Sequence, residues 1–353
     1  MTQINYIDDQ GNLDVLVKIL AKSSLFAIDT EFMRERTYHP TLSLIQLRVN
    51  GQNYIIDCLQ SLNLANFLSL MESDKIKKVI HGARQDLEIF CGQLGLKPKL
   101  IFDTQIMANF SGYDLNCSYA YLVEDLCGKC LNKGLQRSDW LKRPLSPKQL
   151  EYAANDVVFL EEVYQKLSSN IGDRLDWCLE DLGLLIAEVK KDPVPRLVER
   201  FSFRGLSQEE RLKISALIQI REELASKQNI PRQRLLSDHQ IRDLAINGLS
   251  PRFKLAKEAL SEIEEILNAE KLDNRFILKT RKSKLNSESK RALYTKTSQW
   301  LDKIALENNL PKSLLVSSQT LKQLIIDPEL LDQEITGWRW QLFGRQLKQI
   351  ISS

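Results

Sequence analysis

The sequence predicts a mixed α/β domain followed by an all-helical part. Residues 25–58 look like three consecutive strands, with β-branched and aromatic residues dominating the first, and short strands and helical segments follow. Residues 190–195, which contain two prolines, interrupt this pattern, and the apolar residues beyond them recur with helical spacing. The chain has 353 residues, enough for two or three domains.

Three strands are expected at 25–32, 42–49 and 53–58, with Asn50-Gly51 forming a tight hairpin between the last two. Helical spacing follows at 62–71 and again at 84–94, and short strands are expected at 77–80 and 101–102. A three-stranded antiparallel beginning followed by alternating helices and strands indicates a mixed sheet flanked by helices.

Two acids stand inside the first predicted strand. Because side chains alternate along a strand, Asp29 and Glu31 point to the same side. Paired anions under a core are costly, and a bound divalent cation is the usual compensation. An edge strand with its polar face in water is the alternative, so the metal interpretation needs further acids.

The remaining acids come from two later segments. Asp86 lies near the start of the helix that follows His81-Gly82, where it can also simply complement the helix dipole. Tyr152 and Asp156 are four residues apart, and therefore share one face of a helix that begins with the capping box Ser146–Gln149. Asp156 has mostly apolar neighbours, which favours a site over its alternative, a solvent-facing position.

The helical part contains an internal repeat. Ala225–Pro231 matches Ala305–Pro311 at an offset of 80 residues, and the match continues through Leu235 and Leu315. We therefore expect domains at 1–195, 204–284 and 285–353. The strip 271–291 between the repeats has eight basic and two acidic residues, so it is either a linker or a phosphate-contacting segment.

Charge divides along the chain in the same way. Residues 1–195 carry 21 Lys and Arg against 26 Asp and Glu, whereas residues 196–353 carry 28 against 20. An acidic first part and a basic second part suggest chemistry in one and polyanion binding in the other. No signal peptide is expected from the first residues, and six scattered cysteines suit a reducing cytoplasm.

Three motifs in this order resemble the ribonuclease D family of the DEDD exonuclease superfamily. They are Asp29-Thr30-Glu31, His81-Gly82-Ala83-Arg84-Gln85-Asp86 and Tyr152-Ala153-Ala154-Asn155-Asp156, and the text at Thr37–Pro40 and Arg137–Leu145 is also similar. The exonuclease resemblance covers about residues 1–190. The two repeats resemble the helicase-and-ribonuclease-D C-terminal (HRDC) domain, the second copy being more diverged. Position 151 is Glu and position 152 is Tyr, so the chain resembles the branch with tyrosine in its third motif.

The resemblance implies a ribonuclease H-like fold and two divalent metal ions, Mg²⁺ or Mn²⁺. Asp29, Glu31, Asp86 and Asp156 would hold them, with Asp29 bridging both, and Tyr152 would orient the attacking water. The implied reaction is 3′–5′ removal of nucleoside 5′-monophosphates from RNA, in the processing of tRNA precursors and other small structured RNAs. The protein is expected to be cytoplasmic and monomeric.

Further residues are expected to contact the substrate: Thr30, Phe32, Gln46, His81, Arg137 and Trp140. For His81 the competing interpretation is structural, closing the strand end, and for Trp140 it is a surface connection with one anchoring ring. Two rival functions stay open on sequence alone. One is a 3′–5′ DNA exonuclease, and the other is a non-catalytic RNA-binding scaffold, against which the complete set of four acids and Tyr152 argues.

Overall fold

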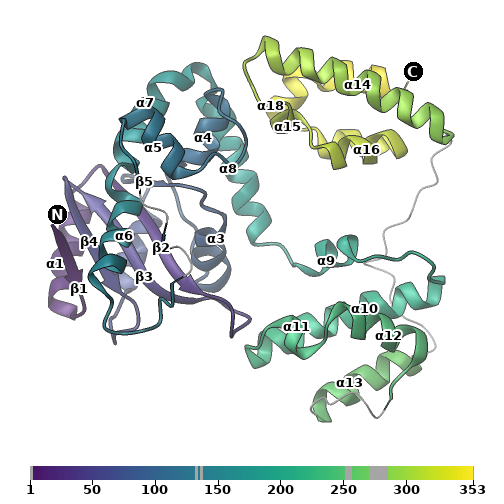
Figure 1. The fold of residues 1–353 in the computed structure, drawn as a ribbon, viewed down its shortest axis with the longest axis horizontal. Coiled ribbons are helices and arrows are strands. Elements are labelled where there is room, and N and C mark those ends of the chain that lie inside the picture. Colours follow the sequence, from purple (N-terminus) through teal and green to yellow (C-terminus); the bar gives the residue numbers. More distant parts are fainter. Residues whose placement is uncertain (1–2, 132–133, 136–137, 251–256, 270–284, 353) are drawn as a thin grey trace. The chain divides into compact units, whose positions relative to one another are not determined.

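A computed structural model of the chain describes residues 3–131, 134–135, 138–250, 257–269 and 285–352 (Figure 1). The chain divides into two compact units. The first contains residues 1–31, 42–190 and 281–353, and the second contains residues 32–41 and 191–280. The three predicted domains remain a proposal, because compactness alone does not define a domain boundary.

A six-stranded mixed sheet lies at the centre of the nuclease part, in the order β1-β4-β3-β2-β5-β6. β3 and β4 are antiparallel, whereas β1 pairs with β4, β2 with β5, and β5 with β6 in parallel. The strands are β1 (Ile4–Ile7), β2 (Leu25–Met33), β3 (Thr41–Val49), β4 (Gln52–Asp57), β5 (Lys77–Ile80) and β6 (Ile101–Asp103).

The predicted mixed α/β fold is confirmed, and the three strands expected over residues 25–58 are β2, β3 and β4. Asn50 and Gly51 both have positive φ, 50° and 77°, as the predicted tight hairpin between β3 and β4 requires. The sequence pattern does not predict β1. This strand has only four residues, and its partner β4 lies about fifty residues later in the chain. No local sequence pattern therefore predicts it.

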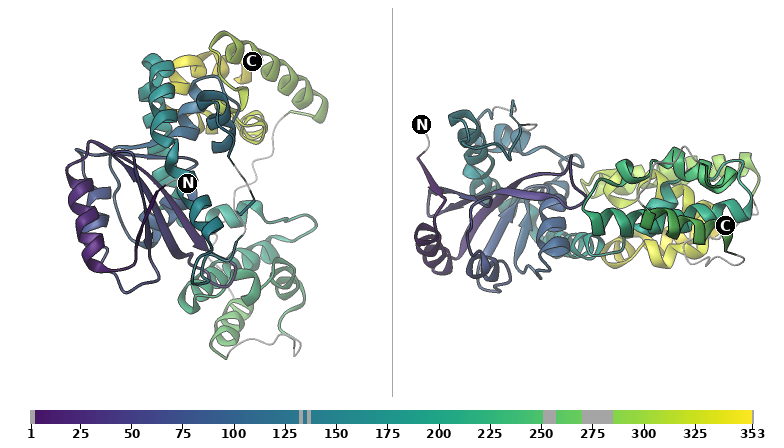
Figure 2. Two further views of the ribbon diagram at one scale, coloured as in Figure 1. Left: turned by 60° about the vertical axis from the view of Figure 1, so that its left-hand side comes forward. Right: turned by 90° about the horizontal axis from the view of Figure 1, so that it is seen from below.

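Helices cover both faces of the sheet (Figures 1 and 2), so β2 is buried on both sides. Phe26 and Ile28 pack in one cluster with α1, whereas Ala27 packs in another with α7. The helices of this part are α1 (Gln10–Ala21), α2 (Ala65–Met71), α3 (Arg84–Leu87) continuing as a π-helix (Glu88–Gln93), α4 (Thr104–Phe110), α5 (Tyr119–Cys127), α6 (Pro147–Val158), α7 (Leu160–Ile171), a 3₁₀ turn (Gly172–Arg174) and α8 (Leu175–Val189).

The second repeat belongs to the same unit as the nuclease sheet. Its buried residues, such as Leu301 and Trp338, form one hydrophobic cluster with Leu160 and Leu167 of α7. The indole of Trp338 stacks on Trp177 of α8 at a centroid distance of 4.9 Å. The elements of this repeat are α14 (Ser287–Glu307), α15 (Lys312–Leu315), α16 (Ser318–Ile326), a 3₁₀ turn (Pro328–Leu330), α17 (Leu331–Glu334), α18 (Gly337–Arg339), a π-helical turn (Trp340–Gly344) and α19 (Arg345–Ser352).

The second unit contains the first repeat, with its own hydrophobic cluster around Ile214, Leu217 and Leu244. Segment 32–41 packs with it: the Tyr38 hydroxyl donates to Glu222 at 3.0 Å. The helices are α9 (Val194–Arg200), α10 (Gln208–Gln228), α11 (Arg232–Leu235), α12 (Asp238–Asn247) and α13 (Lys257–Asn268). Residues 270–284, which include most of the predicted basic strip, lie outside the described residues.

The local structure of the two repeats matches as the sequence predicts. Asn229 ends the first long helix of one copy with φ of 50°, and Asn309, at the matching position of the other, follows the C-cap Asn308 with φ of 48°. Ser237 and Ser317 then cap α12 and α16 by accepting a backbone N–H. Within the described residues, no helix is both long enough and apolar enough to cross a membrane.

Candidate active site

β2 presents the first two acids from its middle onward. The parallel register pairs Leu25 with Lys77 and Ala27 with Val79. Asp29 lies two residues after Ala27 and is therefore level with the end of β5. Asp29 and Glu31 are both half-buried and lie two residues apart on the same strand. The carboxyl ends of parallel strands are the usual place for ligand sites in such sheets.

The turn after β5 brings in the third acid. Gly82 adopts φ of 66°, and the N–H groups of Gly82 and Ala83 donate to the carboxylate of Asp103, each at 2.9 Å. This turn starts α3, where Asp86 is 5% exposed. The hydroxyl of Thr30 donates a hydrogen bond to Asp86. Thr30 thereby ties β2 to α3.

Helix α6 supplies the remaining two groups. The predicted capping box is present: Ser146 accepts the N–H of Gln149, and the Gln149 side chain returns to the backbone N–H of Ser146. The helix ends at Phe159, three residues beyond Asp156, and α7 starts at once. Tyr152 and Asp156 are half-buried on one face of α6.

The four carboxylates act on one another electrostatically. Burial raises the pKa of Asp29 well above its ordinary value, and the charges of Asp86, Asp156 and Glu31 raise it further. Burial and the charges of Asp156 and Asp86 raise the pKa of Glu31 to about 9. Burial raises the pKa of both Asp86 and Asp156 to about 7, although the hydroxyl of Thr30 opposes the shift at Asp86. The sequence motifs therefore meet at one place, where burial and mutual repulsion oppose the simultaneous ionisation of all four acids.

Two tyrosines face this charge. Burial raises the pKa of Tyr152, and Asp156, Glu31 and Asp29 raise it further, so its hydroxyl keeps its proton at neutral pH. Tyr119, the first residue of α5, accepts the N–H of Phe159 at 2.9 Å where α6 ends. Burial raises its pKa too, and it also feels the charges of Asp156 and Asp29.

The donor set fits divalent cations. Carboxylate oxygens are the hard ligands that Mg²⁺ and Mn²⁺ prefer, and the charges that raise the pKa of Asp29 come from three other acids. In the part of the chain that the structure describes, no three His, Cys, Asp or Glu side chains already have the spacing of metal ligands. The fit therefore rests on ligand chemistry and on the mutual electrostatic effect of the four acids.

His81 has protein partners at both ring nitrogens. Nε2 donates to the carbonyl oxygen of Cys117 at 3.0 Å, and Nδ1 lies 2.9 Å from the hydroxyl of Thr104. Burial lowers the pKa of His81, which keeps the ring neutral. This geometry favours the structural interpretation of His81 over substrate contact.

The other residues expected to contact substrate lie in different surroundings. Gln46 of β3 is fully buried, and neither polar atom of its amide has a hydrogen-bond partner among the described residues. Trp140 is 1% exposed, and its ring lies 6.0 Å from that of Tyr152. Phe32 is half-buried in the second unit, with the guanidinium of Arg34 5.8 Å from its ring centre. Arg137 lies outside the described residues.

Sequence reasoning missed Tyr119 and Asp103. Tyr119 stands 33 positions before Tyr152, and only the packing of α5 beside the end of α6 brings it to the carboxylates. Asp103 is the last residue of β6 and caps α4 by accepting the N–H of Gln105 at 2.8 Å. A sequence signal existed for Asp103, since an Asp before a helical segment is a typical N-cap.

Comparisons with known proteins agree with this geometry. A family described as 3′–5′ exonuclease matches residues 4–172. The ribonuclease D of Gluconacetobacter diazotrophicus is 34% identical over 349 residues, covering 94% of this chain and 89% of that protein. The ribonuclease D of Xanthomonas oryzae pv. oryzae is 30% identical and covers 94% of each chain.

The fold is also that of a solved structure. The crystal structure of Escherichia coli RNase D, described as an exoribonuclease involved in structured RNA processing, matches with a TM-score of 0.84 over 99% of both chains at 24% identity. The catalytic core of RRP6 from Trypanosoma brucei matches 76% of this chain with a TM-score of 0.57. The sequence relatives carry the assignment: this chain belongs to the ribonuclease D family and is a 3′–5′ exoribonuclease.

Proposed function

We propose that the enzyme shortens RNA from its 3′ end by two-metal-ion hydrolysis and releases nucleoside 5′-monophosphates. The observation that carries the proposal is the mutual electrostatic effect of Asp29, Glu31, Asp86 and Asp156, which come from three separate elements. When bound, two divalent ions would activate water and stabilise the leaving oxygen of an in-line displacement. All four carboxylates would hold them.

Each residue then has a defined task. The β2 strand carries Asp29 and Glu31 on a rigid central element, which favours accurate placement of the ligands. Thr30 holds Asp86 by its hydrogen bond. Tyr152 keeps its proton, so it would donate a hydrogen bond and orient the attacking water rather than act as a base.

The substrates we infer are tRNA precursors and other small structured RNAs with single-stranded 3′ tails. The net charge of residues 196–353, with 28 Lys and Arg against 20 Asp and Glu, suits binding of the RNA body by HRDC-like repeats. The six cysteines are all free thiols, which supports a reducing compartment such as the cytoplasm.

The test is a time course on a 3′-extended tRNA precursor and a DNA strand of matched sequence. Chelation of divalent ions should stop the release of nucleoside 5′-monophosphates from RNA, and Mn²⁺ or Mg²⁺ should restore it. Degradation that persists in chelator would contradict the metal mechanism. Equal rates on the DNA strand would show that the enzyme does not select RNA.

A modified RNA end tests recognition of the terminus. An oligoribonucleotide with a 3′-phosphate should be degraded more slowly than the same strand with a free 3′-hydroxyl, because the proposed site recognises the terminal hydroxyl and a phosphate there adds bulk and charge. Equal rates would place recognition elsewhere on the RNA.

A further inference from the structure

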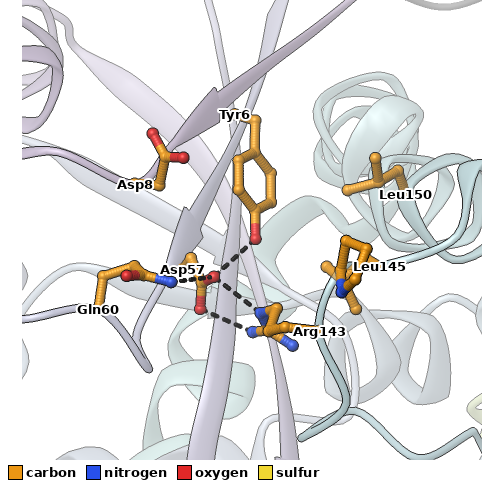
Figure 3. A pocket seen from close by; sticks show the side chains of 8 residues that line it. Tyr6, Asp8, Asp57, Gln60, Arg143, Leu145 and Leu150 are labelled. Carbon is orange, nitrogen blue, oxygen red and sulfur yellow. Dashed lines mark hydrogen bonds and ion pairs between the residues drawn. The ribbon is translucent and has the colours of Figure 1, made fainter.

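A polar cluster outside the carboxylate site lies beside a cavity of about 330 Å³ (Figure 3). At its centre is Asp57, the last residue of β4, which is 1% exposed. Arg143 forms a two-pronged ion pair with Asp57, with Nε and Nη2 each 2.7 Å from a carboxylate oxygen. The hydroxyl of Tyr6 and the amide of Gln60 donate to the same carboxylate at 2.7 and 3.1 Å.

Arg143 uses its whole donor set within the protein. A guanidinium has five N–H groups. Two reach Asp57, Nη1 donates to the carbonyls of Trp140 and Lys142 at 2.7 and 3.0 Å, and Nη2 also donates to the hydroxyl of Ser43 at 3.1 Å. This saturation leaves the guanidinium poorly suited to bind an anion from solution. Its contacts instead fix the loop that contains it.

The loop held in this way leads to the active site. The carbonyl of Trp140 accepts from Arg143 and also from the hydroxyl of Ser43 at 2.5 Å, which ties the loop to β3. Three residues after Arg143, Ser146 caps α6, the helix that carries Tyr152. The ring of Trp140 is tilted by 38° against the ring of Tyr152 at 6.0 Å.

The indole N–H of Trp140 is buried and has no acceptor among the described residues. Hydrogen bonding by the indole therefore does not set the position of the ring. The anchored carbonyl and the surrounding packing set it. Displacement of the loop would move the surface against which Tyr152 packs, and a misplacement of about 1 Å can cost about 100-fold in rate.

We propose that Arg143, locked by Asp57, is a positioning residue for Tyr152. It acts through Trp140 and the start of α6, without touching the substrate. The inference rests on the proposed role of Tyr152 in orienting the attacking water. It adds a function for the Arg143–Asp57 pair, which none of the three sequence motifs contains.

The test is a double-mutant cycle in the full-length enzyme, with Arg143→Lys and Tyr152→Phe made singly and together. Lysine keeps the charge beside Asp57 but cannot make five directed bonds. With a free 3′-hydroxyl oligoribonucleotide and saturating Mn²⁺, Arg143→Lys should lower kcat about 30-fold and leave KM within about threefold. In the Tyr152→Phe background the same change should cost no more than about threefold, because the residue it positions has lost its hydroxyl.

Controls separate positioning from general damage. Gln60 is exposed and donates one hydrogen bond to Asp57. Gln60→Ala removes that bond and leaves every bond of Arg143 in place, so the kcat of this variant should stay within about twofold of wild type. Binding of Mn²⁺ measured by calorimetry without RNA should be unchanged in Arg143→Lys. If that variant does not fold, Ser43→Ala removes only the hydroxyl bonds to Trp140 and Arg143. It should cost about fivefold, and again only when Tyr152 is intact.

Two outcomes overturn the inference in distinguishable ways. Equal losses from Arg143→Lys in both backgrounds would show that Arg143 does not act through Tyr152, with the proposed function intact. Full activity of Tyr152→Phe alone would refute the proposed role of Tyr152, and the positioning inference with it.

Discussion

Carboxylates on one sheet have two opposite environments. Asp57 at the end of β4 is buried, which acts to raise its pKa, but hydrogen bonds from Arg143, Tyr6 and Gln60 outweigh burial and hold the pKa well below its usual value. On β2, the pKa of Glu31 rises to about 9, because burial is joined by the charges of Asp156 and Asp86. The protein neutralises Asp57 with its own donors, whereas for the four acids of the proposed site a cation from solution would supply the neutralising charge.

The largest effect should come from an active-site acid. Asp156→Asn should lower exonuclease activity about 1000-fold, because it removes a proposed metal ligand. Without metal, however, the variant should be at least as stable as wild type, because a repelling charge has gone. Exonuclease rates at saturating Mn²⁺ test the loss of activity, and urea unfolding in chelator tests the stability. Asp173→Asn, at an exposed acid, should change neither. An Asp156→Asn enzyme with wild-type rate would refute the proposed site.

The compensated acid should behave in the opposite way. Asp57→Asn should lower the free energy of unfolding by about 3 kcal/mol, because it leaves the partly buried guanidinium of Arg143 without its ion pair. Urea unfolding in chelator, at the same pH for both variants, gives the comparison directly. If both Asp57→Asn and Asp156→Asn lowered the free energy of unfolding, or both raised it, the distinction between the two environments would be wrong.

Stability should depend on pH with opposite signs in the two places. Asp86, Asp156 and Glu31 have raised folded-state pKa values of about 7, 7 and 9. The folded state therefore holds more protons than the unfolded state above about pH 4, and stability falls as pH rises toward about 9. The pKa of Asp57 is lowered instead, so its stabilisation is present above about pH 4 and is lost only in stronger acid.

Thermal unfolding of the metal-free enzyme between about pH 6 and 9 measures the active-site part of this dependence. The midpoint should fall with rising pH, Mn²⁺ should recover most of the loss at high pH, and Asp156→Asn should flatten the slope. A midpoint that rises over this range, with no response to Mn²⁺, would contradict the assignment.

The smallest effect should come from Tyr119, which lies at the edge of the anionic site. Tyr119→Phe removes the acceptor of the Phe159 N–H, where α6 ends three residues after Asp156. We expect kcat to fall about fivefold, since one hydrogen bond contributes about 1 kcal/mol. Tyr121→Phe is the matched control, because Tyr121 lies two residues further along α5 and is 52% exposed. Equal effects of the two substitutions would remove Tyr119 from the site.

Much of the fold could be predicted because its signals are local. The strand-like runs over 25–58, the Asn50-Gly51 hairpin and the capping box at Ser146 all depend on neighbouring residues. β1 was not predicted, because its four residues form a strand only by pairing with β4, which is distant in the sequence. The helix expected over 84–94 is present, but most of it is π-helical, a distinction that helical spacing does not reveal.

The residues of the candidate site likewise divide into those with a local sequence signal and those brought together by long-range contacts. Asp29, Glu31, Asp86, Tyr152 and Asp156 stand in recognisable motifs, so the sequence alone identifies them as candidates. Tyr119 and the Arg143–Asp57 pair bring together residues far apart in the chain, the latter separated by 86 positions. Such pairs depend on strand order and loop placement, which composition and spacing do not contain.

The second repeat shares its hydrophobic core with the nuclease, and this changes what a truncated enzyme would be. Trp338 stacks on Trp177, and Arg339 forms an ion pair with Asp181 of α8 at 2.6 Å. A methyl group added at Gly337 would overlap the carboxylate of Glu180, which would then have to move away from the N–H of Trp338. Removal of residues 285–353 would therefore expose apolar surface of the catalytic part. Contact with α8 therefore constrains the sequence of this copy in addition to the packing of its own helices.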